Sequence, residues 1–393
     1  MKNLFKYASL LMAAAMLFSC EGTVDPDGPT PGPEPGPGPE PGNLELKISS
    51  DKNLIQTNVD EATLTVTLGD EVITEDVTFF DGNNKVMSIP NFKFSASEVG
   101  DYVIWANYGT YISDKITIKA TDLEIPASPK DPKPASTDFK SRILITEFTT
   151  VGCTYCPAVK EIVHNLLEDP EMSEKIVVTE CHSGLVGGVA DPCYLHDRAF
   201  EDYCAITGFP TLKLDIDYLV KDRTALGSLV NQMIAAKEGT VPGLAVNAKC
   251  ENNNVVAKVT VKAAADASYR VGAFLLEDGI YAEQKSATAD WMHTHNNVIR
   301  YVDAAYKTTY YGYPVADIEA GKTADIMFSW LLEDIWEYGS SKGAINGGIA
   351  WPERNNDNLH MVVFVSMSDS QGGYYIANVI DCPINGETPF EYR

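Results

Sequence analysis

The chain has 393 residues, of which 45% are hydrophobic and 22% are charged, and 55 acidic residues outnumber 30 Lys and Arg. The length predicts two to three domains, since globular domains contain roughly 100–200 residues. A formal net charge of −25 excludes a basic surface for phosphate backbones, so we expect no nucleic-acid partner. The 8 Cys are too few for a disulfide scaffold, and their positions matter more than their number.

The N-terminal residues have the pattern of an export signal. Lys2 and Lys6 precede an apolar run that ends in LFSC at Cys20, and this run is too short to remain as a spanning helix. The ending resembles a bacterial lipobox, in which the Cys thiol is lipidated and becomes the first residue of the mature protein. The resemblance implies a signal peptide at 1–19 and a lipid on Cys20 as the membrane attachment. The alternative is an ordinary secretory signal with an incidental Cys.

Two Pro-rich segments separate the predicted domains. The segment 20–43 begins with the predicted lipidated Cys and contains 8 Pro and 5 Gly between residues 26 and 42. Such a sequence forms no core and favours polyproline II, so we expect a stalk reaching ~50 Å at ~3.1 Å per residue; a ligand for an aromatic groove is the alternative. A second linker is predicted at 121–138.

Residues 44–120 alternate apolar and polar side chains in short bursts such as ATLTVTL and KITIKA. Period two with Gly-Asp and Asp-Gly breaks predicts antiparallel strands and a small β-sandwich. The run VGDYVIWANYG at 99–109 resembles a corner of bacterial Ig-like modules. We therefore expect an Ig-like spacer or binding module.

The next segment, 139–240, alternates strands and helices as an α/β unit does, and 241–393 returns to strands, which predicts a second, larger β-sandwich. The predicted fold class is thus multidomain, β plus α/β. After a β-rich run at 143–148, apolar residues recur at helical spacing. They are Val159, Ile162, Val163 and Leu166.

A Cys-x-x-Cys motif, Cys153 to Cys156, opens this predicted helix. A thiol at a helix N-terminus has a lowered pKa because unpaired N–H groups and the helix dipole favour the thiolate. Cys153 is therefore the candidate exposed nucleophile and Cys156 the resolving thiol. A zinc site would need a second pair at similar spacing, which the other Cys do not supply.

The context of the motif resembles the thioredoxin superfamily. An acid, Glu147, lies six residues before the first Cys, and Gly208-Phe209-Pro210-Thr211 matches the segment whose Pro is cis in that superfamily. The resemblance implies that Glu147 relays a proton to the resolving Cys and that Pro210 faces the disulfide and positions the substrate. A closing helix is predicted at 224–237. The alternative is a retained scaffold in which the Cys153–Cys156 disulfide is structural.

Three further Cys follow the motif. Asp191-Pro192 is typical of a helix start, and a helix from there to Gly208 would separate Cys193 and Cys204 by ~16 Å, beyond disulfide reach. We therefore expect Cys181 to pair with one of them. The adjacent His182 is expected to be an ordinary polar residue with its hydrogen bonds satisfied near a sheet edge, with redox tuning as the alternative.

In the last domain, Cys250 and Cys382 end two predicted strands. They form a disulfide if the strands are neighbours and are buried free thiols if not. His293 and His295 share one strand face and could meet His360. Because no carboxylate or Cys stands at a telling spacing, we expect no metal site and no cofactor.

Aromatic residues concentrate in the same domain. They could form a recognition face for a protein or glycan ligand, or they could pack in the core. They are Trp291, Trp330, Trp336, Trp351 and the Tyr cluster at 301–313.

Taken together, the lipobox, the CxxCP motif, the GFPT segment and HTHNNVIRYV at 293–302 resemble the outer-membrane lipoprotein family related to the 28-kDa Omp antigens. That resemblance implies a thioredoxin-like domain followed by a jelly-roll-like domain in the cell envelope. We expect an outer-membrane, lipid-anchored thiol-disulfide oxidoreductase or isomerase-like protein acting on protein substrates. The alternative is a surface-exposed binding or adhesion lipoprotein with a structural disulfide.

Overall fold

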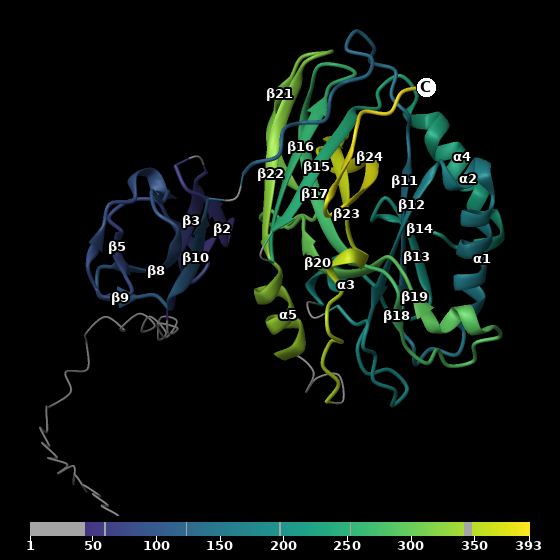
Figure 1. Cartoon of the computed structure of the whole chain (residues 1–393), viewed down its shortest axis with the longest axis horizontal. Helices are drawn as coiled ribbons and strands as arrows, with labels where there is room; N and C mark the ends of the chain where they lie inside the picture. The colour runs from purple at the N-terminus through teal and green to yellow at the C-terminus, as the bar shows by residue number, and fades with distance from the viewer. Residues whose placement is uncertain (1–43, 59, 123, 196–197, 252, 342–347) are drawn as a thin grey trace, which may run out of the picture. The chain divides into compact units, whose positions relative to one another are not determined.

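The computed structural model describes residues 44–58, 60–122, 124–195, 198–251, 253–341 and 348–393. The predicted signal peptide, the predicted lipidation site Cys20 and the stalk up to residue 43 lie outside the described residues. The described chain is mostly β-sheet arranged as several sheets (Figure 1), as expected for a multidomain β protein. Of the helices in these ranges, none is long and apolar enough to cross a bilayer.

The first folded segment, 46–121, consists of two small sheets. Alternation decides which side chains face inward: in β3 (Ala62–Leu68), Ala62, Leu64 and Val66 are buried and the intervening threonines are exposed. Both sheets contribute to one hydrophobic cluster, which includes Phe79, Ile104 and Ile118. The first sheet comprises β1 (Leu46–Ser50), β3, β4 (Glu71–Ile73) and β7 (Lys93–Phe94). The second comprises β2 (Leu54–Gln56), β10 (Ile116–Thr121), β8 (Gly100–Tyr108), β5 (Thr78–Asp81), β6 (Val86–Met87) and β9 (Tyr111–Ile112).

The Cys-x-x-Cys motif follows a strand that is buried along its whole length. β11 (Ile143–Thr149) pairs in parallel with β12 (Ile176–His182) and antiparallel with β13 (Thr211–Leu214), which pairs with β14 (Tyr218–Leu219). Both faces of β11 and β12 are covered, which explains their continuous burial.

Helices cover one face of these strands (Figure 1). They are α1 (Cys156–Glu168), α2 (Pro170–Ser173) and α4 (Leu226–Lys237). The predicted apolar face of α1 is confirmed: Val159 and Val163 are buried against Ile143 and Ile145, and Ile162 and Leu166 pack beside them. The closing helix is also confirmed, with Leu226 and Val230 in the same core.

The two halves expected as separate domains, 139–240 and 241–393, share one sheet. Glu180 of β12 pairs with Val298 of β20 (Val298–Asp303), and the Glu180 amide donates to the Asn297 carbonyl at 2.8 Å. The sheet order is β14-β13-β11-β12-β20-β17-β23-β24, with β21 also paired to β17. The remaining strands are β17 (Ala267–Glu277), β21 (Tyr313–Ile318), β23 (Leu359–Ser368) and β24 (Tyr374–Pro383).

This sheet curls back on itself. Asn378 of β24 accepts a hydrogen bond from the Arg142 amide at 3.0 Å and donates to the Lys140 carbonyl at 3.0 Å, just before β11 begins. The inner side of the curl is apolar and includes Phe148, Phe274 and Phe364. The predicted boundary at 240/241 therefore crosses a continuous structure.

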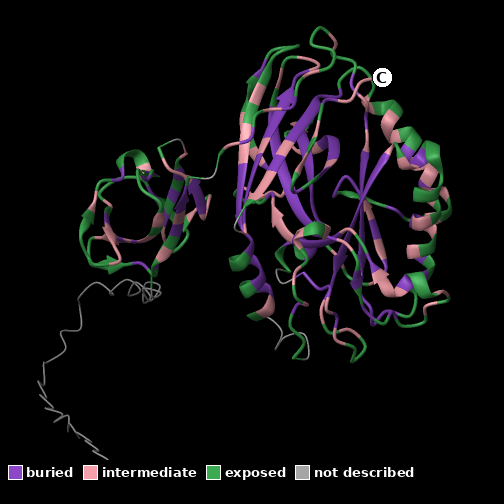
Figure 2. Ribbon diagram, in the orientation of Figure 1, coloured by how far each residue is buried: buried purple, intermediate pink, exposed green. Residues whose placement is uncertain are grey.

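A second sheet packs on the β17 and β23 part of the first. It contains β22 (Thr323–Leu331), β16 (Asn254–Lys262), β15 (Gly243–Glu251) and β25 (Gly386–Thr388). Its core extends to the short helix α5 (Leu332–Ser341). Figure 2 shows that buried residues follow the central strands, whereas the helices expose their outer faces.

The helix predicted between Asp191 and Gly208 is wrong. Among the described residues of this segment the only helix is α3 (Ala199–Tyr203). Asp191 does not cap a helix there; its Oδ1 accepts from the Cys193 amide at 2.8 Å and its Oδ2 from the Val151 amide at 2.9 Å. The sequence pattern predicted that the Asp191 carboxylate caps a helix. It accepts hydrogen bonds from the backbone of residues 151 and 193 instead.

Candidate functional site

Cys153 and Cys156 form a disulfide at the start of α1, with their Cα atoms 5.5 Å apart. Tyr155 between them is 75% exposed, but Cys153 is only 7% exposed and Cys156 only 1%. The prediction that Cys153 is the exposed member of the pair is therefore wrong for this conformation. The segments that pack around Cys153 explain its burial.

Two segments cover the chain just before the disulfide. The Gln284 side-chain amide donates to the Cys153 carbonyl at 3.1 Å, and the Lys285 amide donates to the Val151 carbonyl at 2.8 Å. On the other side the loop after β12 comes so close that a Cβ on Gly152 would lie 2.2 Å from the Val186 carbonyl oxygen. Gly152 is thus required by this close approach.

The peptide bond between Phe209 and Pro210 is cis, as the resemblance implied. The next residue, Thr211, pairs with Phe148 in the strand that leads to the motif, so Pro210 lies at the same end of β11 as the disulfide. The Arg223 guanidinium donates to the Pro210 carbonyl at 2.8 Å.

Glu147 is buried on the face of β11 that α1 covers, two residues after Ile145. Its Oε2 atom has no hydrogen-bond partner among the described residues. Burial, and next the negative charge of Glu180 on β12, raise the pKa of the Glu147 carboxyl well above its ordinary range. The raised pKa favours the protonated form of the side chain.

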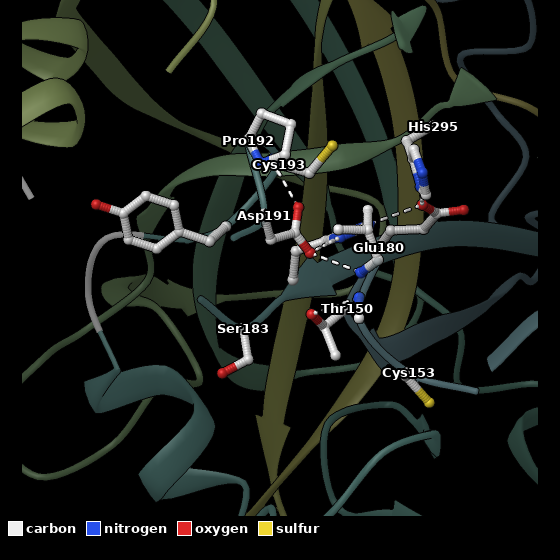
Figure 3. A network of polar contacts seen from close by, with 12 residues as sticks. Thr150, Cys153, Glu180, Ser183, Asp191, Pro192, Cys193 and His295 are labelled. Atoms are coloured by element: carbon white, nitrogen blue, oxygen red, sulfur yellow. Dashed lines mark hydrogen bonds and ion pairs between the residues drawn. The ribbon is translucent and has the colours of Figure 1, made fainter. Parts of the chain in front are cut away.

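A buried polar network lies beside Glu147, and sequence reasoning missed it (Figure 3). His182, on the same face as Glu180, places Nδ1 2.9 Å from Asp191 Oδ2 and Nε2 3.1 Å from Glu180 Oε2. Burial alone would lower the pKa of His182, but the carboxylates of Asp191 and Glu180 raise it to about 9. The imidazole is thus held between two acids.

Lys160 of α1 and His295 of β19 (Thr294–His295) complete this network. Lys160 Nζ lies 3.6 Å from Glu180 Oε1 and 3.1 Å from His295 Nδ1. Burial would raise the pKa of Glu180, but Lys160 and the two imidazoles hold it well below its usual range. Among the described strands β19 pairs with β18 (Ile280–Tyr281). It lies just before β20, whose pairing with β12 brings His295 to the site.

One signal could have revealed the network. Glu180 and His182 occupy alternate positions at the carboxyl end of a fully buried strand, which is where α/β sheets collect functional side chains. The position of His295 in the network could not be found this way. It depends on the pairing of β12 with β20, which lie far apart in the sequence.

The predicted disulfides outside the motif do not form. Cys181, Cys193 and Cys204 are buried free thiols; Cys181 and Cys204 lie in one apolar cluster and Cys193 in another. The proposed pairing of Cys181 with either of the other two is therefore wrong. Burial raises the pKa of all three thiols.

Cys250 and Cys382 are also free, so of the two alternatives for this pair the disulfide does not form. The Cys382 sulfur lies 3.9 Å from the Val246 carbonyl oxygen. Val246 is four residues before Cys250 on β15, which corresponds to ~13 Å at ~3.3 Å per residue. β15 and β24 belong to two different sheets that pack on each other, and the two thiols lie at different positions along their strands.

The three His considered for a metal site do not come together. His293 accepts a hydrogen bond from the Gln284 amide at 3.0 Å, and His360 lies 2.7 Å from Asp381 in another part of the sheet. Most of the Trp residues singled out earlier serve the core: Trp330, Trp336 and Trp351 are buried. The half-exposed Trp291 stacks on His164 at a centroid distance of 4.2 Å.

His360 should make stability depend on pH. Burial would lower its pKa, but Asp278 and Asp381 raise it to about 9. A His whose pKa is raised in the folded state stabilises the fold fully when the pH is below its unfolded pKa of about 6.5. This contribution to stability is lost as the pH rises through the folded pKa. We expect the chain to lose on the order of 2 kcal/mol between about pH 6.5 and pH 9 through this group.

Denaturant unfolding at both pH values measures this loss, and His360→Gln is the matching variant. The variant should be less stable than wild type at pH 6.5 and should lose less stability on going to pH 9. An equal loss in both proteins would assign the pH dependence to other groups.

Comparison with known proteins gives distant structural likenesses. No family model matches the chain, and no curated protein matches it. HBP35 of Porphyromonas gingivalis is 18% identical with a TM-score of 0.46, over 65% of this chain and 78% of that one. A crystal structure from Agrobacterium tumefaciens is 13% identical with a TM-score of 0.38, over 66% and 100%. A DUF4785 family protein from Legionella pneumophila is 8% identical with a TM-score of 0.19, over 87% and 56%. At these values the likenesses carry neither a fold family nor a function to this chain.

Proposed function

We propose that the chain is a lipid-anchored protein of the outer membrane, with a thioredoxin-like region whose Cys153–Cys156 pair exchanges with protein thiols and disulfides. The anchor is supported by the LFSC sequence that ends at Cys20. The thioredoxin-like region is supported by the disulfide at the start of α1, by the cis peptide before Pro210 and by the strand order around β11.

The observation that carries the redox proposal is Glu147. A buried carboxyl with an unpartnered oxygen costs roughly 1–3 kcal/mol, and a structural disulfide has no use for it. Its raised pKa favours a proton on the face of β11 that α1 covers. A proton at that place serves a thiolate that forms there.

The exchange proceeds in two balanced steps. A substrate thiolate attacks the sulfur of Cys153 and forms a mixed disulfide, while the Cys153–Cys156 bond breaks and Cys156 leaves as a thiolate that accepts the proton of Glu147. A second substrate thiolate then attacks the substrate sulfur of the mixed disulfide and releases Cys153. The substrate dithiol is oxidised to a disulfide, and the Cys pair is reduced.

A second candidate function is a surface-exposed binding lipoprotein with a structural disulfide, whose β regions bind a protein or glycan. The covered position of the pair favours it: Cys153 is 7% exposed, and Gln284 and Lys285 hold the preceding residues. Under the first candidate this cover has to open before a protein substrate reaches the sulfur.

The experiment that separates the candidates measures the reduction potential of the full chain and the alkylation rate of Cys153 after reduction. A redox function predicts a potential above about −300 mV and rapid alkylation.

The variant Gly152→Ala tests the cover, because its Cβ would collide with the Val186 carbonyl and displace the loop. We expect faster alkylation in this variant. A potential below about −300 mV with an inert Cys153 in both proteins would establish the structural disulfide.

A further inference from the structure

Three side chains that the redox proposal does not use converge next to the disulfide. One nitrogen of His182, one nitrogen of His295 and the sulfur of Cys193 all lie within 4.8 Å of one another. All three residues are fully buried. They come from three segments: the end of β12, the loop that follows it, and β19 (Figure 3).

The second observation is an unpartnered nitrogen. His295 Nε2 is buried and has no hydrogen-bond partner among the described residues, although Nδ1 of the same ring contacts Lys160 and Glu180. Leaving a buried polar atom unpaired costs free energy. An ion at this nitrogen would remove that cost.

The carboxylate of Asp191 orients the other two groups. It lies 2.9 Å from His182 Nδ1, and it also accepts from the Cys193 amide at 2.8 Å. A carboxylate on the far nitrogen of an imidazole is the usual partner of a metal-binding His, since it fixes the ring and its tautomer. The Nε2 atom of His182 then faces the cluster, where Glu180 Oε2 lies 3.1 Å away.

We propose that His182, Cys193 and His295 bind one zinc ion, with a water in the fourth position. Two imidazoles and a thiolate are ligands that zinc takes in tetrahedral sites that keep one position for water, with ligand bonds of ~2.0–2.3 Å. Ligand atoms in such a site are about 3.5 Å apart, so the side chains have to close by about one ångström. Zinc displaces the proton of the Cys193 thiol and the proton that His182 shares with Glu180.

Lys160 is compatible with the ion because it has other acceptors. Its ammonium donates to the Thr294 carbonyl at 3.0 Å and lies 3.6 Å from Glu180 Oε1. With zinc on Nε2, the Nδ1 atom of His295 carries the proton and donates to Glu180, which lies 3.4 Å away. Zinc would thereby tie the loop after β12 to the hairpin of β18 and β19.

The test is zinc binding by the purified full chain, with the Cys153–Cys156 disulfide kept oxidised so that its sulfurs do not bind metal. After chelator treatment, titration against a chromophoric chelator should show one zinc ion per chain. Cobalt in place of zinc should give the sulfur-to-cobalt charge-transfer band and the visible spectrum of a tetrahedral site. Both signals report ligation and do not depend on redox activity.

Variants assign the ligands. Cys193→Ser should abolish the cobalt charge-transfer band, and His295→Gln should abolish tight zinc binding. Asp191→Asn should weaken the affinity for zinc by about 10–100-fold. Cys204→Ser is the matched control, since Cys204 is also a buried free thiol but lies in another cluster. Near-ultraviolet circular dichroism of each zinc-free variant shows whether it is folded.

The proposal is overturned if the folded wild-type chain binds no zinc, if Cys193→Ser and His295→Gln bind as tightly as wild type, or if Cys204→Ser loses binding equally. Should one ligand variant fail to fold, the other decides. Because these readouts are independent of thiol exchange, a failed redox assay leaves them intact, and loss of zinc binding leaves the redox proposal intact.

Discussion

Reduction of the Cys153–Cys156 disulfide by a small dithiol should slow by about 100-fold at neutral pH when Glu147 is replaced by Gln. The expected factor is that of a lost proton transfer, which typically contributes 10²–10⁴-fold. Glu147 has a raised pKa because it is buried and faces Glu180, and under the redox proposal it supplies the proton to the departing Cys156 thiolate. Gln has the same shape but cannot supply that proton. Rapid-quench alkylation of the reduced thiols measures the rate.

Glu201→Gln is the matched control for this prediction. Glu201 is likewise buried and has a raised pKa, mainly through burial, but it lies on α3 and contacts Ser183. Its substitution should leave the reduction rate unchanged. An unchanged rate in Glu147→Gln, or an equal decrease in both variants, would remove Glu147 from the exchange. The free energy of unfolding separates a chemical effect from loss of folding. Because Glu147→Gln removes an acid whose burial costs free energy, the variant should be no less stable than wild type.

Replacing Glu277 with Ala should destabilise the chain by about 3–5 kcal/mol, the usual cost of leaving one buried charge without its partner. Arg300 Nε donates to Glu277 Oε2 at 2.8 Å, and both side chains are buried. The guanidinium also donates to the Pro192 carbonyl at 3.1 Å and lies over Trp351 at 4.5 Å. Without Glu277 the positive charge of Arg300 stays in this apolar setting.

Denaturant unfolding followed by Trp fluorescence measures this loss. Glu171→Ala is the control: Glu171 pairs with Lys175 at 2.6 Å, but its side chain is 78% exposed. Exposed pairs contribute about 0–1 kcal/mol, so we expect a small change. Replacing both Glu277 and Arg300 with Met should recover most of the stability. A loss below about 1 kcal/mol in Glu277→Ala would show that the buried charge is compensated elsewhere.

Local patterns predicted local structure well. The spacing of Val159 and Val163 predicted the buried face of α1, and the resemblance of the segment 208–211 to a known superfamily implied the cis peptide bond before Pro210. Both features depend on residues that are close in sequence. The alternation of ATLTVTL likewise predicted which side chains of β3 are buried.

Contacts between distant segments could not be predicted. Asp191 has the sequence of a helix cap, but Val151, Cys193 and His182 all use its carboxylate. The sequence left open whether Cys250 and Cys382 form a bridge, because strand order and the packing of the two sheets cannot be read from composition; both thiols are free. The cover over Cys153 depends on Gln284, more than a hundred residues away in sequence.

The pairing of Glu180 with Val298 also has a consequence for the order of folding. Contacts between residues so far apart in sequence form late, since closing a long loop costs entropy before the contact is gained. The segment that supplies Gln284 and His295 is made after the Cys pair, so these thiols stay open to oxidants until the later strands are in place. An oxidant therefore reaches the thiols before the site is buried, and a disulfide made at that stage does not require the cover to open.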